Sequence, residues 1–599
     1  MLLQSGRPVP SAQARALRRA AVQSARPCRV IPGGRSAVRA DAAAAIASPA
    51  VAVEEALPGI ETTHDKNVHG TAGSVVVEQP GLKRASTLRN IMFVTSEVAP
   101  WSKTGGLADV LGSLPFALAE RGHRVMVVSP RWVLLGRFRY SLLTLAAMEA
   151  PFFLELPVPP QQQDPPRSPT ALAAAEAAAA AAAKAANGSG PTAAAIAEIE
   201  AVVQAESSVP KTKYGQDIMF VANDWHTSLI PVYLAAKYRP HGVYGNARAI
   251  LAIHNLRHQG VFPPYTYESL GLPPHWYGCL EWQYPPHQRQ GSWAEEGRSV
   301  NHLKAGLTTA DRVVTVSAGY AEEIKTYLGG WGMEGIIAAR DPVLNGIVNG
   351  IDTDEWNPSI DPHLPATYDA TNFVEGKAKC KMELQRELGL PVNEHIPLVA
   401  FIGRLDPQKG ADILLEAAPA LLRHNNVQLV CLGSGNKDLE DGLRWLEAEF
   451  KDRARGWVGF NVPFRARGWV GFNVPFSHKL TAAADILLMP SRFEPCGLNQ
   501  LYAMRYGAVP VAHKTGGLRD TVLDFNPWAQ EGTGWTYTSC DAQGLLHAVG
   551  VALLTYNNHK EDFRKLQLRG MAREASWDGA AQQYEQIIDW AFMDPPYCR

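Results

Sequence analysis

The order of apolar and glycine-rich segments after residue 88 is the feature that most restricts how this chain can fold. Residues 91–95 form an almost wholly apolar run, and residues 103–107 have the sequence KTGGL. A helical spacing of Leu and Val then extends from Leu107 to Leu118, and a second apolar run covers residues 124–129. Short apolar runs of this kind are typical of strands buried on both faces. The order strand, glycine loop, helix, strand therefore predicts a parallel α/β sheet.

The same unit recurs in the second half of the chain. A helical pattern covers residues 410–424, and strand patterns cover residues 397–403, 427–433, 485–489 and 509–513. We therefore predict two doubly wound α/β domains, joined near residues 330–345.

The first 40 residues differ in composition from all that follows. They contain eight Arg, no Lys and no acidic residue. An Arg-rich, acid-free start is typical of an organelle transit peptide. A basic disordered tail is the alternative, but the segment lacks the Lys and aromatic residues of a nucleic-acid-binding arm. We assign residues 1–86 to a transit peptide and a disordered linker.

The charge balance excludes further functional classes. The formal net charge is −1, so the chain after the basic segment carries −9. This balance provides no general positive field for nucleic acid. No apolar run reaches the roughly 18 residues that a membrane helix needs. We expect neither a nucleic-acid partner nor a membrane span.

Two stretches interrupt the α/β pattern. Residues 157–211 begin with a Pro/Gln tract, and 13 of the 16 residues from 171 to 186 are Ala. A solvated surface insertion is favoured there over a binding helix, because an Ala tract has no amphipathic face. Residues 453–464 (RARGWVGFNVPF) are repeated at residues 465–476. We expect this repeat to be accommodated as a loop, since two copies are too few for a solenoid.

The seven cysteines occur singly, without a C-x-x-C pair. This spacing argues against a disulfide framework and a structural zinc site, and fits a reducing compartment. The histidines show no metal-ligand spacing, so no metal and no cofactor is predicted.

Polar loops follow three predicted strands of the first half. Lys103, Gly105 and Gly106 precede a helix, where an anion is favoured, although a tight turn would explain the glycines equally well. The sequences NDWH at residues 223–226 and IHN at residues 253–255 also follow apolar runs. His226, His254 and Asn255 should therefore reach the same edge, but either histidine could have only a structural role.

Two loops of the second half carry the other candidate residues. Arg404 and Lys409 would suit a departing diphosphate, and an ion pair between Arg404 and Asp406 is the structural alternative. Residues 492–500 (RFEPCGLNQ) lie between a predicted strand and helix. In this segment Glu494 can accept hydrogen bonds from sugar hydroxyls. The amides of Gly497 and Leu498 are expected to point into the ligand-binding cleft at the carboxyl ends of the strands. Cys496 is expected to be a packed residue, since no nearby His activates it. Gly435 belongs to a glycine turn of low specificity.

Together, residues 103–107, 223–226, 403–409 and 492–500 resemble the bacterial glycogen synthase and plant starch synthase family of retaining glucosyltransferases. The similarity extends from about Leu88 to Arg599, outside the insertion. Residues 234–240, 270–282, 343–358 and 589–592 are most similar to the soluble starch synthases of class I.

This resemblance implies a glycosyltransferase-B fold of two Rossmann-like domains, which we place at residues 87–335 and 336–575. Residues 576–599 would form a C-terminal helix that crosses back to the first domain. The implied activity is transfer of glucose from ADP-glucose, a co-substrate, to an α-1,4-glucan such as amylopectin. Other starch-biosynthesis enzymes are candidate partners, in the plastid stroma or at the starch granule surface.

The resemblance also implies roles for the site residues. The catalytic set is Lys103, His226, Arg404, Lys409 and Glu494. The set that binds ADP-glucose is Lys103, Gly105, Gly106, Asn255, Arg404, Lys409, Gly435, Glu494, Cys496, Gly497 and Leu498.

The chain departs from the family at two places. Only four residues separate Trp132 from Arg137, where family members carry several dozen, including an acid on the cleft wall. We expect a shortening of this size to leave strands unpaired, so either an exon is missing from this sequence or the product is catalytically impaired. Lys514 also occupies a position where the family has a small residue. The alternative functions are therefore those of a glucan-binding or scaffolding relative without activity, or of a UDP-sugar transferase. A phosphorylase is not expected, because this chain lacks the cofactor-lysine motif of that family.

Overall fold

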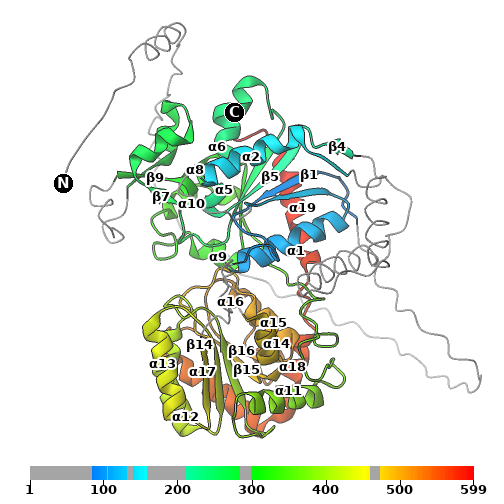
Figure 1. The fold of residues 1–599 in the computed structure, drawn as a ribbon, viewed down its shortest axis with the longest axis vertical. Helices are drawn as coiled ribbons and strands as arrows, with labels where there is room; N and C mark the ends of the chain where they lie inside the picture. Colours follow the sequence, from blue (N-terminus) through cyan, green and yellow to red (C-terminus); the bar gives the residue numbers. More distant parts are fainter. Residues whose placement is uncertain are drawn as a thin grey trace, which may run out of the picture. The chain divides into compact units, whose positions relative to one another are not determined.

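A computed structural model describes residues 84–103, 105–130, 139–157, 211–283, 298–458 and 473–598. Two six-stranded parallel sheets dominate the described chain, one in each half of the sequence (Figure 1). Two small antiparallel sheets accompany the first one. No helix among the described residues is long and apolar enough to cross a membrane.

The first sheet has the strand order β11-β10-β6-β5-β1-β2. Its strands are β1 (Asn90–Val94), β2 (Arg124–Val128), β5 (Ile218–Asn223), β6 (Arg248–Ile253), β10 (Arg312–Thr315) and β11 (Leu344–Gly346). The accompanying helices are α1 (Gly106–Glu120), α2 (Arg139–Phe153), α5 (Asp224–Thr227), α6 (Ile230–Tyr233), α7 (Tyr277–Leu280), α8 (His302–Thr309), α9 (Ala318–Glu323) and α10 (Glu334–Ala339). The chain adds β2 on one side of β1 and β5 on the other, so the topology changes direction between β1 and β5.

Both faces of this sheet are buried. Ile91 and Phe93 of β1 pack with α1 on one face, while Met92 and Val94 belong to the apolar cluster on the other face. The same alternation occurs in β5 and β6, because successive side chains of a strand point to opposite faces. This two-sided burial is why the strands have continuous apolar sequences.

The second sheet has the order β14-β13-β12-β15-β16-β17, which in chain order is the Rossmann order 3-2-1-4-5-6. Its strands are β12 (Leu398–Ile402), β13 (Gln428–Gly433), β14 (Ala454–Val458), β15 (Ile486–Met489), β16 (Val509–His513) and β17 (Trp535–Tyr537). The helices are α11 (Phe373–Glu387), α12 (Ala411–His424), α13 (Lys437–Glu449), α14 (Val474–Ala483), α15 (Asn499–Arg505), α16 (Gly516–Thr521), α17 (Ala542–Asn558) and α18 (Lys560–Met571). Here the topology changes direction between β12 and β15.

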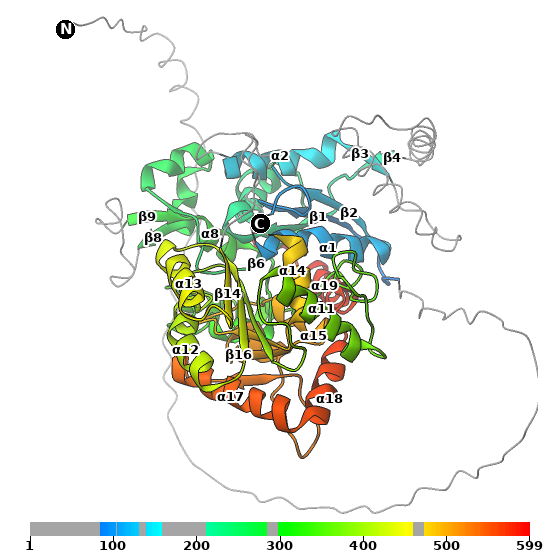
Figure 2. The ribbon, with the colours of Figure 1, turned by 60° about the horizontal axis from the view of Figure 1, so that its bottom comes forward.

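Helices cover this second sheet on both faces as well (Figure 2). Val399 and Phe401 of β12 pack with α12, α13 and α17, whereas Leu398, Ala400 and Ile402 pack with α11 and α14. Each face of this sheet therefore carries an apolar core.

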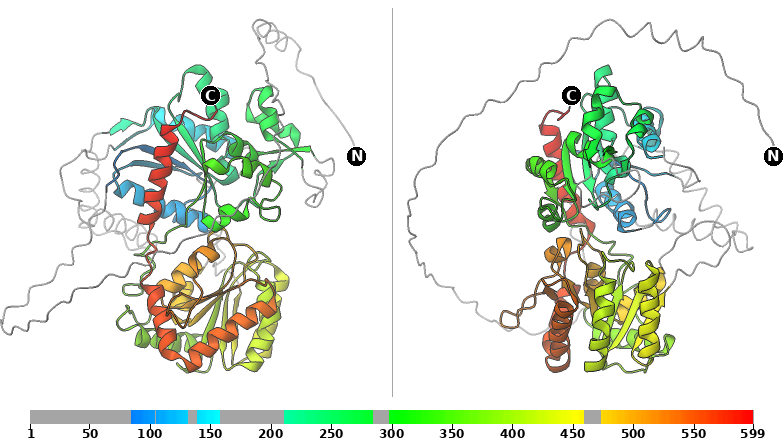
Figure 3. Two further views of the ribbon diagram at one scale, coloured as in Figure 1. Left: turned by 180° about the vertical axis from the view of Figure 1, so that it is seen from behind. Right: turned by 90° about the vertical axis from the view of Figure 1, so that its left-hand side faces the viewer.

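The last helix, α19 (Trp577–Met593), packs against the first sheet although it follows α18 in sequence (Figure 3). Trp577, Tyr584 and Ile588 share an apolar cluster with α1 and with one face of β1. Buried Arg121 donates two hydrogen bonds to the Glu585 carboxylate, at 2.7 and 2.9 Å, and a third to Asp578 at 2.7 Å. Charged and apolar contacts thus both hold α19 on the first half of the chain.

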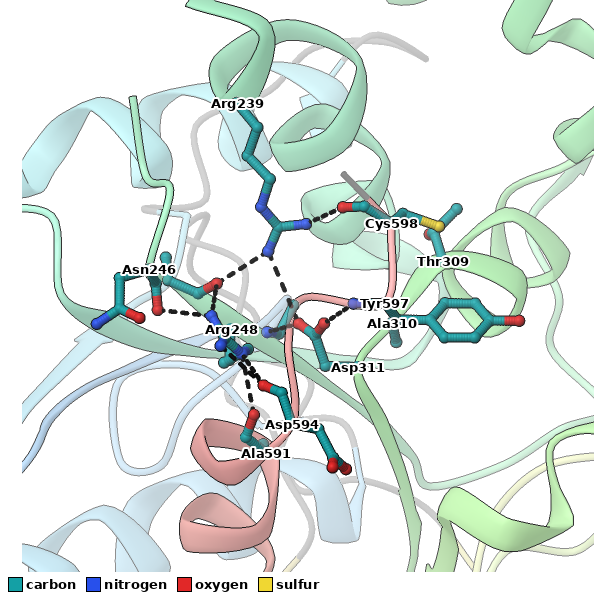
Figure 4. Close-up of polar contacts among 12 residues, drawn as sticks. Arg239, Asn246, Arg248, Thr309, Ala310, Asp311, Ala591, Asp594, Tyr597 and Cys598 are labelled. Carbon is teal, nitrogen blue, oxygen red and sulfur yellow. Dashed lines mark hydrogen bonds and ion pairs between the residues drawn. The ribbon is translucent and has the colours of Figure 1, made fainter. Parts of the chain in front are cut away.

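The residues after α19 are held at the amino end of β6 and β10 (Figure 4). Arg248 donates hydrogen bonds to the carbonyl oxygens of Ala591 and Asp594. The backbone N–H of Tyr597 donates to Asp311, which also accepts the N–H of Ala249 at the other carboxylate oxygen. The residues that follow α19 therefore supply hydrogen-bond partners at the amino ends of β6 and β10. This edge of the first sheet is opposite the edge that carries the predicted site residues.

The shortened segment at residues 132–137 lies outside the described residues. The strand before it, β2, pairs only with β1 in the described part of the chain. Of its five residues only Met126 is buried, and the other four are half-buried. Thus β2 is an edge strand in the described sheet.

The two interruptions of the sequence pattern begin and end in regular structure. Most of the 157–211 insertion lies outside the described residues, but β3 (Glu155–Pro157) and β4 (Lys211–Lys213) pair antiparallel at its two ends. The first repeat copy supplies β14, and the second supplies the start of α14, where Asn473 accepts the N–H of Phe476. Our expectation that the repeat forms a loop is therefore wrong for its ends, because strand pairing and helix capping order them.

The α19 ion pairs generate a stability prediction. We expect Glu585→Ala to lower the free energy of unfolding by about 3 kcal/mol, because the side chain of Arg121 is only 5% exposed and would lose its bidentate partner. Urea unfolding at pH 7 measures this change. As a control, Glu561→Ala removes an exposed pair with Arg564 on α18 and should cost less than about 0.5 kcal/mol. Equal losses for the two variants would contradict the role given to Arg121.

Candidate functional site

The predicted site residues follow the strands that flank the two topological switch points. The loop with Lys103 follows β1 and the turn with His226 follows β5, on either side of the first switch point. The loop with Arg404 and Lys409 follows β12, and Glu494 follows β15, on either side of the second. Doubly wound sheets bind ligands at the carboxyl ends of the strands at such points.

The KTGGL loop leads directly from the β1 segment into α1. Lys103 is exposed, and its ammonium lies 2.6 Å from the carboxylate of Asp109 in the first turn of that helix. Burial raises the pKa of Asp109, and the charge of Lys103 opposes that rise. A Cβ atom added at Gly105 would meet nothing within 4 Å, and one at Gly106 would meet only Leu498, at 3.7 Å. Packing against the described residues therefore does not require these glycines, and in the described structure the space beside them is open to a ligand.

The turn after β5 holds His226 between two aromatic rings. Its ring centroid lies 4.1 Å from that of Trp225 and 4.8 Å from that of Tyr140 in α2. Burial, followed by the positive potential of His258, lowers the pKa of His226 to about 4. The imidazole is therefore neutral near pH 7. Its Nδ1 atom has no hydrogen-bond partner among the residues that the structure describes.

Two neighbouring polar residues connect this turn to the adjacent strands. The side-chain amide of Asn223 donates to the carbonyl oxygen of Val94, and its oxygen lies 3.0 Å from Nε2 of His254. Asp224 accepts the backbone N–H groups of His254 and Asn255 at 2.7 and 3.3 Å. His254 is thus held by the last residue of β5 and the first residue of α5, as the structural alternative for this histidine predicted. Asn255 is half-buried, and its side-chain oxygen accepts the N–H of Arg257.

The central contact of the second switch point is an ion pair between Lys409 and Glu494. Their charged atoms are 2.5 Å apart, and Ser491 donates a hydrogen bond to the same carboxylate oxygen at 3.1 Å. Arg404 is exposed and pairs with Asp406 at 3.0 Å, which is the ion pair of the structural alternative for Arg404. Because the Arg404 side chain is 56% exposed, it is accessible to a ligand anion.

The segment after Glu494 is fixed by contacts with both halves of the chain. The Ser317 hydroxyl donates to the Pro495 carbonyl at 2.7 Å, and the Gly517 N–H donates to the Glu494 carbonyl at 3.0 Å. Cys496 is buried, and burial raises the pKa of its thiol to about 12. The thiol is therefore protonated near pH 7, which fits a packed residue better than a nucleophile. Gly497 has a φ of +72°, a conformation that favours glycine.

Gly435 is explained by packing. A Cβ atom there would lie 2.4 Å from the carbonyl oxygen of Leu405, and the Gly435 N–H donates to Glu440 at 3.0 Å. This glycine therefore allows two loops to pack closely, and no contact in the described chain points to a ligand role.

Contacts between the loops show which residues the structure brings together. Leu498 is the neighbour of Gly106, and the positive charge of Arg404 contributes to lowering the pKa of His258. Lys514, the second departure from the family, lies 3.6 Å from Asp524 in an exposed pair. Among the described residues, no ion pair or hydrogen bond joins Lys514 to Glu494 or Lys409.

Sequence reasoning gave no site role to Asp109, Asp224 or Ser491. Asp224 could have been found, because it is an acidic residue placed immediately after a buried strand. Asp109 and Ser491 carried no such signal, since their importance depends on which side chains fold beside them. Among the described residues, no group of three or more His, Cys, Asp or Glu side chains could hold a metal ion.

Comparisons with known proteins give the same class as this geometry. Residues 90–339 match the family model described as starch synthase catalytic domain, and residues 396–553 match that of glycosyl transferases group 1. The catalytic domain of starch synthase IV from Arabidopsis thaliana, solved with ADP and acarbose, superposes with a TM-score of 0.62 at 27% identity. That superposition covers 85% of this chain and all of the solved one. The chain therefore has the glycosyltransferase-B fold.

The sequence relatives narrow the class further. Soluble starch synthase 1 of Solanum tuberosum, a chloroplastic/amyloplastic protein, is 49% identical over 527 residues, which cover 85% of this chain and 80% of the relative. Starch synthase 1 of Arabidopsis thaliana is 45% identical over 562 residues, covering 88% and 82%. The chain belongs to the starch synthase family of glycosyltransferases.

His302 yields a prediction on the pH dependence of stability near the site. It is buried beside Phe262, neither ring nitrogen has a partner in the described chain, and burial lowers its pKa to about 4. Below pH 6.5 the His302 imidazole binds a proton in the unfolded state but stays neutral in the folded state. The free energy of unfolding therefore falls as the pH falls toward 4. His302→Phe removes this loss, which amounts to at most about 1.4 kcal/mol per pH unit.

Thermal unfolding midpoints at pH 7, 6 and 5 test this prediction. The midpoint of the wild-type protein should fall relative to that of His302→Phe as the pH decreases. The exposed His395 provides the control, and His395→Phe should follow the wild-type curve. Parallel curves for the wild type and His302→Phe would show that His302 titrates normally.

Proposed function

We propose that this chain transfers the glucosyl group of ADP-glucose to the non-reducing 4-hydroxyl of an α-1,4-glucan, with retention of configuration. The observation that carries the proposal is the placement of all five predicted catalytic residues beside the two switch points. Family membership supports the reaction class, and the ADP and acarbose of the solved relative support a nucleotide sugar and a glucan as substrates.

The charged residues would serve the departing diphosphate. Arg404 and Lys409 both follow β12, and each is paired with a carboxylate of the protein. We expect donor binding to exchange these internal partners for phosphate oxygens. Lys103 would contribute a third cation from the β1 loop by leaving Asp109. Preorganised cations of this kind stabilise the negative charge that develops as the bond to ADP breaks.

The sugar would be held by groups from both switch points. Glu494 would accept hydrogen bonds from the glucose hydroxyls, and the amides of Gly497 and Leu498 would donate to them. Neutral His226 would lie beneath the anomeric carbon, where an uncharged ring avoids repelling the cationic character of the transition state. Asn255 would contact the donor from the loop after β6.

Front-face attack is the mechanism that these residues favour. The bond from the anomeric carbon to the diphosphate oxygen breaks, and the acceptor 4-oxygen forms the new bond on the same face. The proton of the acceptor hydroxyl passes to the departing phosphate oxygen, so no enzyme nucleophile is needed. Double displacement is the alternative, and the protonated thiol of Cys496 makes it an unsuitable nucleophile for that route.

The remaining assignments belong to the same proposal. ADP-glucose is a co-substrate, and fixed Lys and Arg side chains can supply the charge stabilisation without a metal or cofactor. The chloroplastic/amyloplastic relatives support a plastid location, in the stroma or at the granule surface. Other starch-biosynthesis enzymes are candidate partners.

Labelled ADP-glucose and amylopectin test the activity of the full chain. We expect incorporation of label into the glucan, and we expect unlabelled ADP-glucose to compete better than UDP-glucose. Glucan binding without incorporation would instead support the scaffolding alternative that the short 132–137 segment raises. Stronger competition by UDP-glucose would refute the donor assignment.

Two substitutions test the residue roles. Lys103→Ala and Glu494→Ala should each lower turnover at least tenfold, which corresponds to roughly 1.4 kcal/mol of transition-state stabilisation. Lys565→Ala and Glu561→Ala, both on the exposed side of α18, provide matched controls with normal turnover. Unfolding midpoints close to that of the wild type would separate lost catalysis from lost folding. Near-normal turnover of either site variant would refute the role of that residue.

A further inference from the structure

Asp224 combines two features that are costly for folding. It is the first residue of α5, and its φ of +54° is a left-handed conformation that residues with a Cβ atom rarely adopt. Its carboxyl side chain is also buried, since the residue is only 7% exposed. Among the described residues no Lys, Arg or His forms an ion pair with it. An ordinary structural acid would have a cation partner or an exposed position.

The contacts of the carboxylate show what this arrangement achieves. One oxygen atom accepts two consecutive backbone N–H groups, those of His254 and Asn255, in the loop after the neighbouring strand β6. Burial raises the pKa of Asp224 to about 7, although these two N–H groups oppose the rise. The side chain therefore joins the loop after β6 to the turn after β5.

Both joined segments carry residues of the proposed site. His226 lies two residues after Asp224 in the same short helix, and Asn255 supplies one of the two N–H groups. A shift of the β6 loop would therefore move Asn255 relative to His226. In rigidly positioned sites, displacements of about 1 Å are enough to lower the rate by orders of magnitude.

We propose that Asp224 is a positioning residue that locks the His226 turn and the Asn255 loop into one donor-binding arrangement. This inference rests on the proposed function, because it assigns Asn255 and His226 to the ADP-glucose site. The left-handed backbone aims the carboxylate at the β6 loop, and the two accepted N–H groups hold that loop in place.

Substitutions at this one position separate the acceptor from the backbone strain. Asp224→Gly removes the acceptor and relieves the left-handed strain, so it should fold at least as readily as Asp224→Ala. Asp224→Asn retains an oxygen that can accept the same two N–H groups. Asp217→Gly makes the same change at an exposed Asp before β5, at the opposite end of that strand, and is the matched control.

Calorimetric binding of ADP-glucose to the full chain gives the first readout. We expect at least fivefold weaker binding for Asp224→Gly, and binding within twofold of the wild type for Asp224→Asn and Asp217→Gly. In glucosyl transfer, the KM for ADP-glucose should rise in parallel while the KM for the glucan stays unchanged. A residue that only supported folding would lower the active fraction without this selective change.

Amide hydrogen exchange gives a second readout that does not depend on activity. The His254 and Asn255 amides should exchange at least tenfold faster in Asp224→Gly than in the wild type, while the amides of β12 remain unchanged. Unchanged exchange at these amides, or faster exchange with normal ADP-glucose binding, would overturn the proposal. A wild-type chain that neither binds nor uses ADP-glucose would refute the proposed function, whereas the exchange result would still decide whether Asp224 holds the two loops.

Discussion

Burial of both sheets on both faces is the constraint on which the rest of this structure depends. The strands β1, β5, β12 and β15 carry apolar side chains on each face, so a polar group within them would lose its hydration without compensation. Chemistry is therefore confined to the strand ends. At the carboxyl ends the strands separate where the topology changes direction, and the candidate residues occur at these points.

The positive charges at these strand ends are paired with carboxylates of the protein itself. Lys103, Arg404 and Lys409 each lie within 3.0 Å of a carboxylate oxygen from a nearby element. Such pairs hold flexible side chains near the position that a diphosphate would occupy and limit the number of conformations lost on binding. The buried acid Asp224 has a different role, because no cation of the described chain pairs with it and it accepts backbone N–H groups from the next loop.

Much of the fold and part of the site could be predicted from sequence because local patterns determine them. The expected strand at residues 397–403 and helix at residues 410–424 correspond to β12 and α12. The residues after each strand were found because parallel strands place their carboxyl ends at one edge. The carboxylate partner of Lys103 and the hydroxyl beside Glu494 were not found, since Asp109 and Ser491 matter only through the side chains that fold beside them. The pairing of the first repeat copy with β13 was also not predicted, because two identical copies give no signal for which one forms the strand.

The sequence by itself determined the two α/β units, their glycine loops and the resemblance to starch synthases, because apolar periodicity and motif spacing are local properties. The tertiary structure decided which carboxylates form ion pairs with which Lys and Arg side chains. It also decided that Gly435 allows close packing of two loops, and that α19 packs on the first sheet through Arg121 and Glu585. It also decided the pKa of His226 and of Asp224, since burial depends on segments distant in sequence. Hydrogen bonds and desolvation depend on distances in space, and these exist only once the chain has folded.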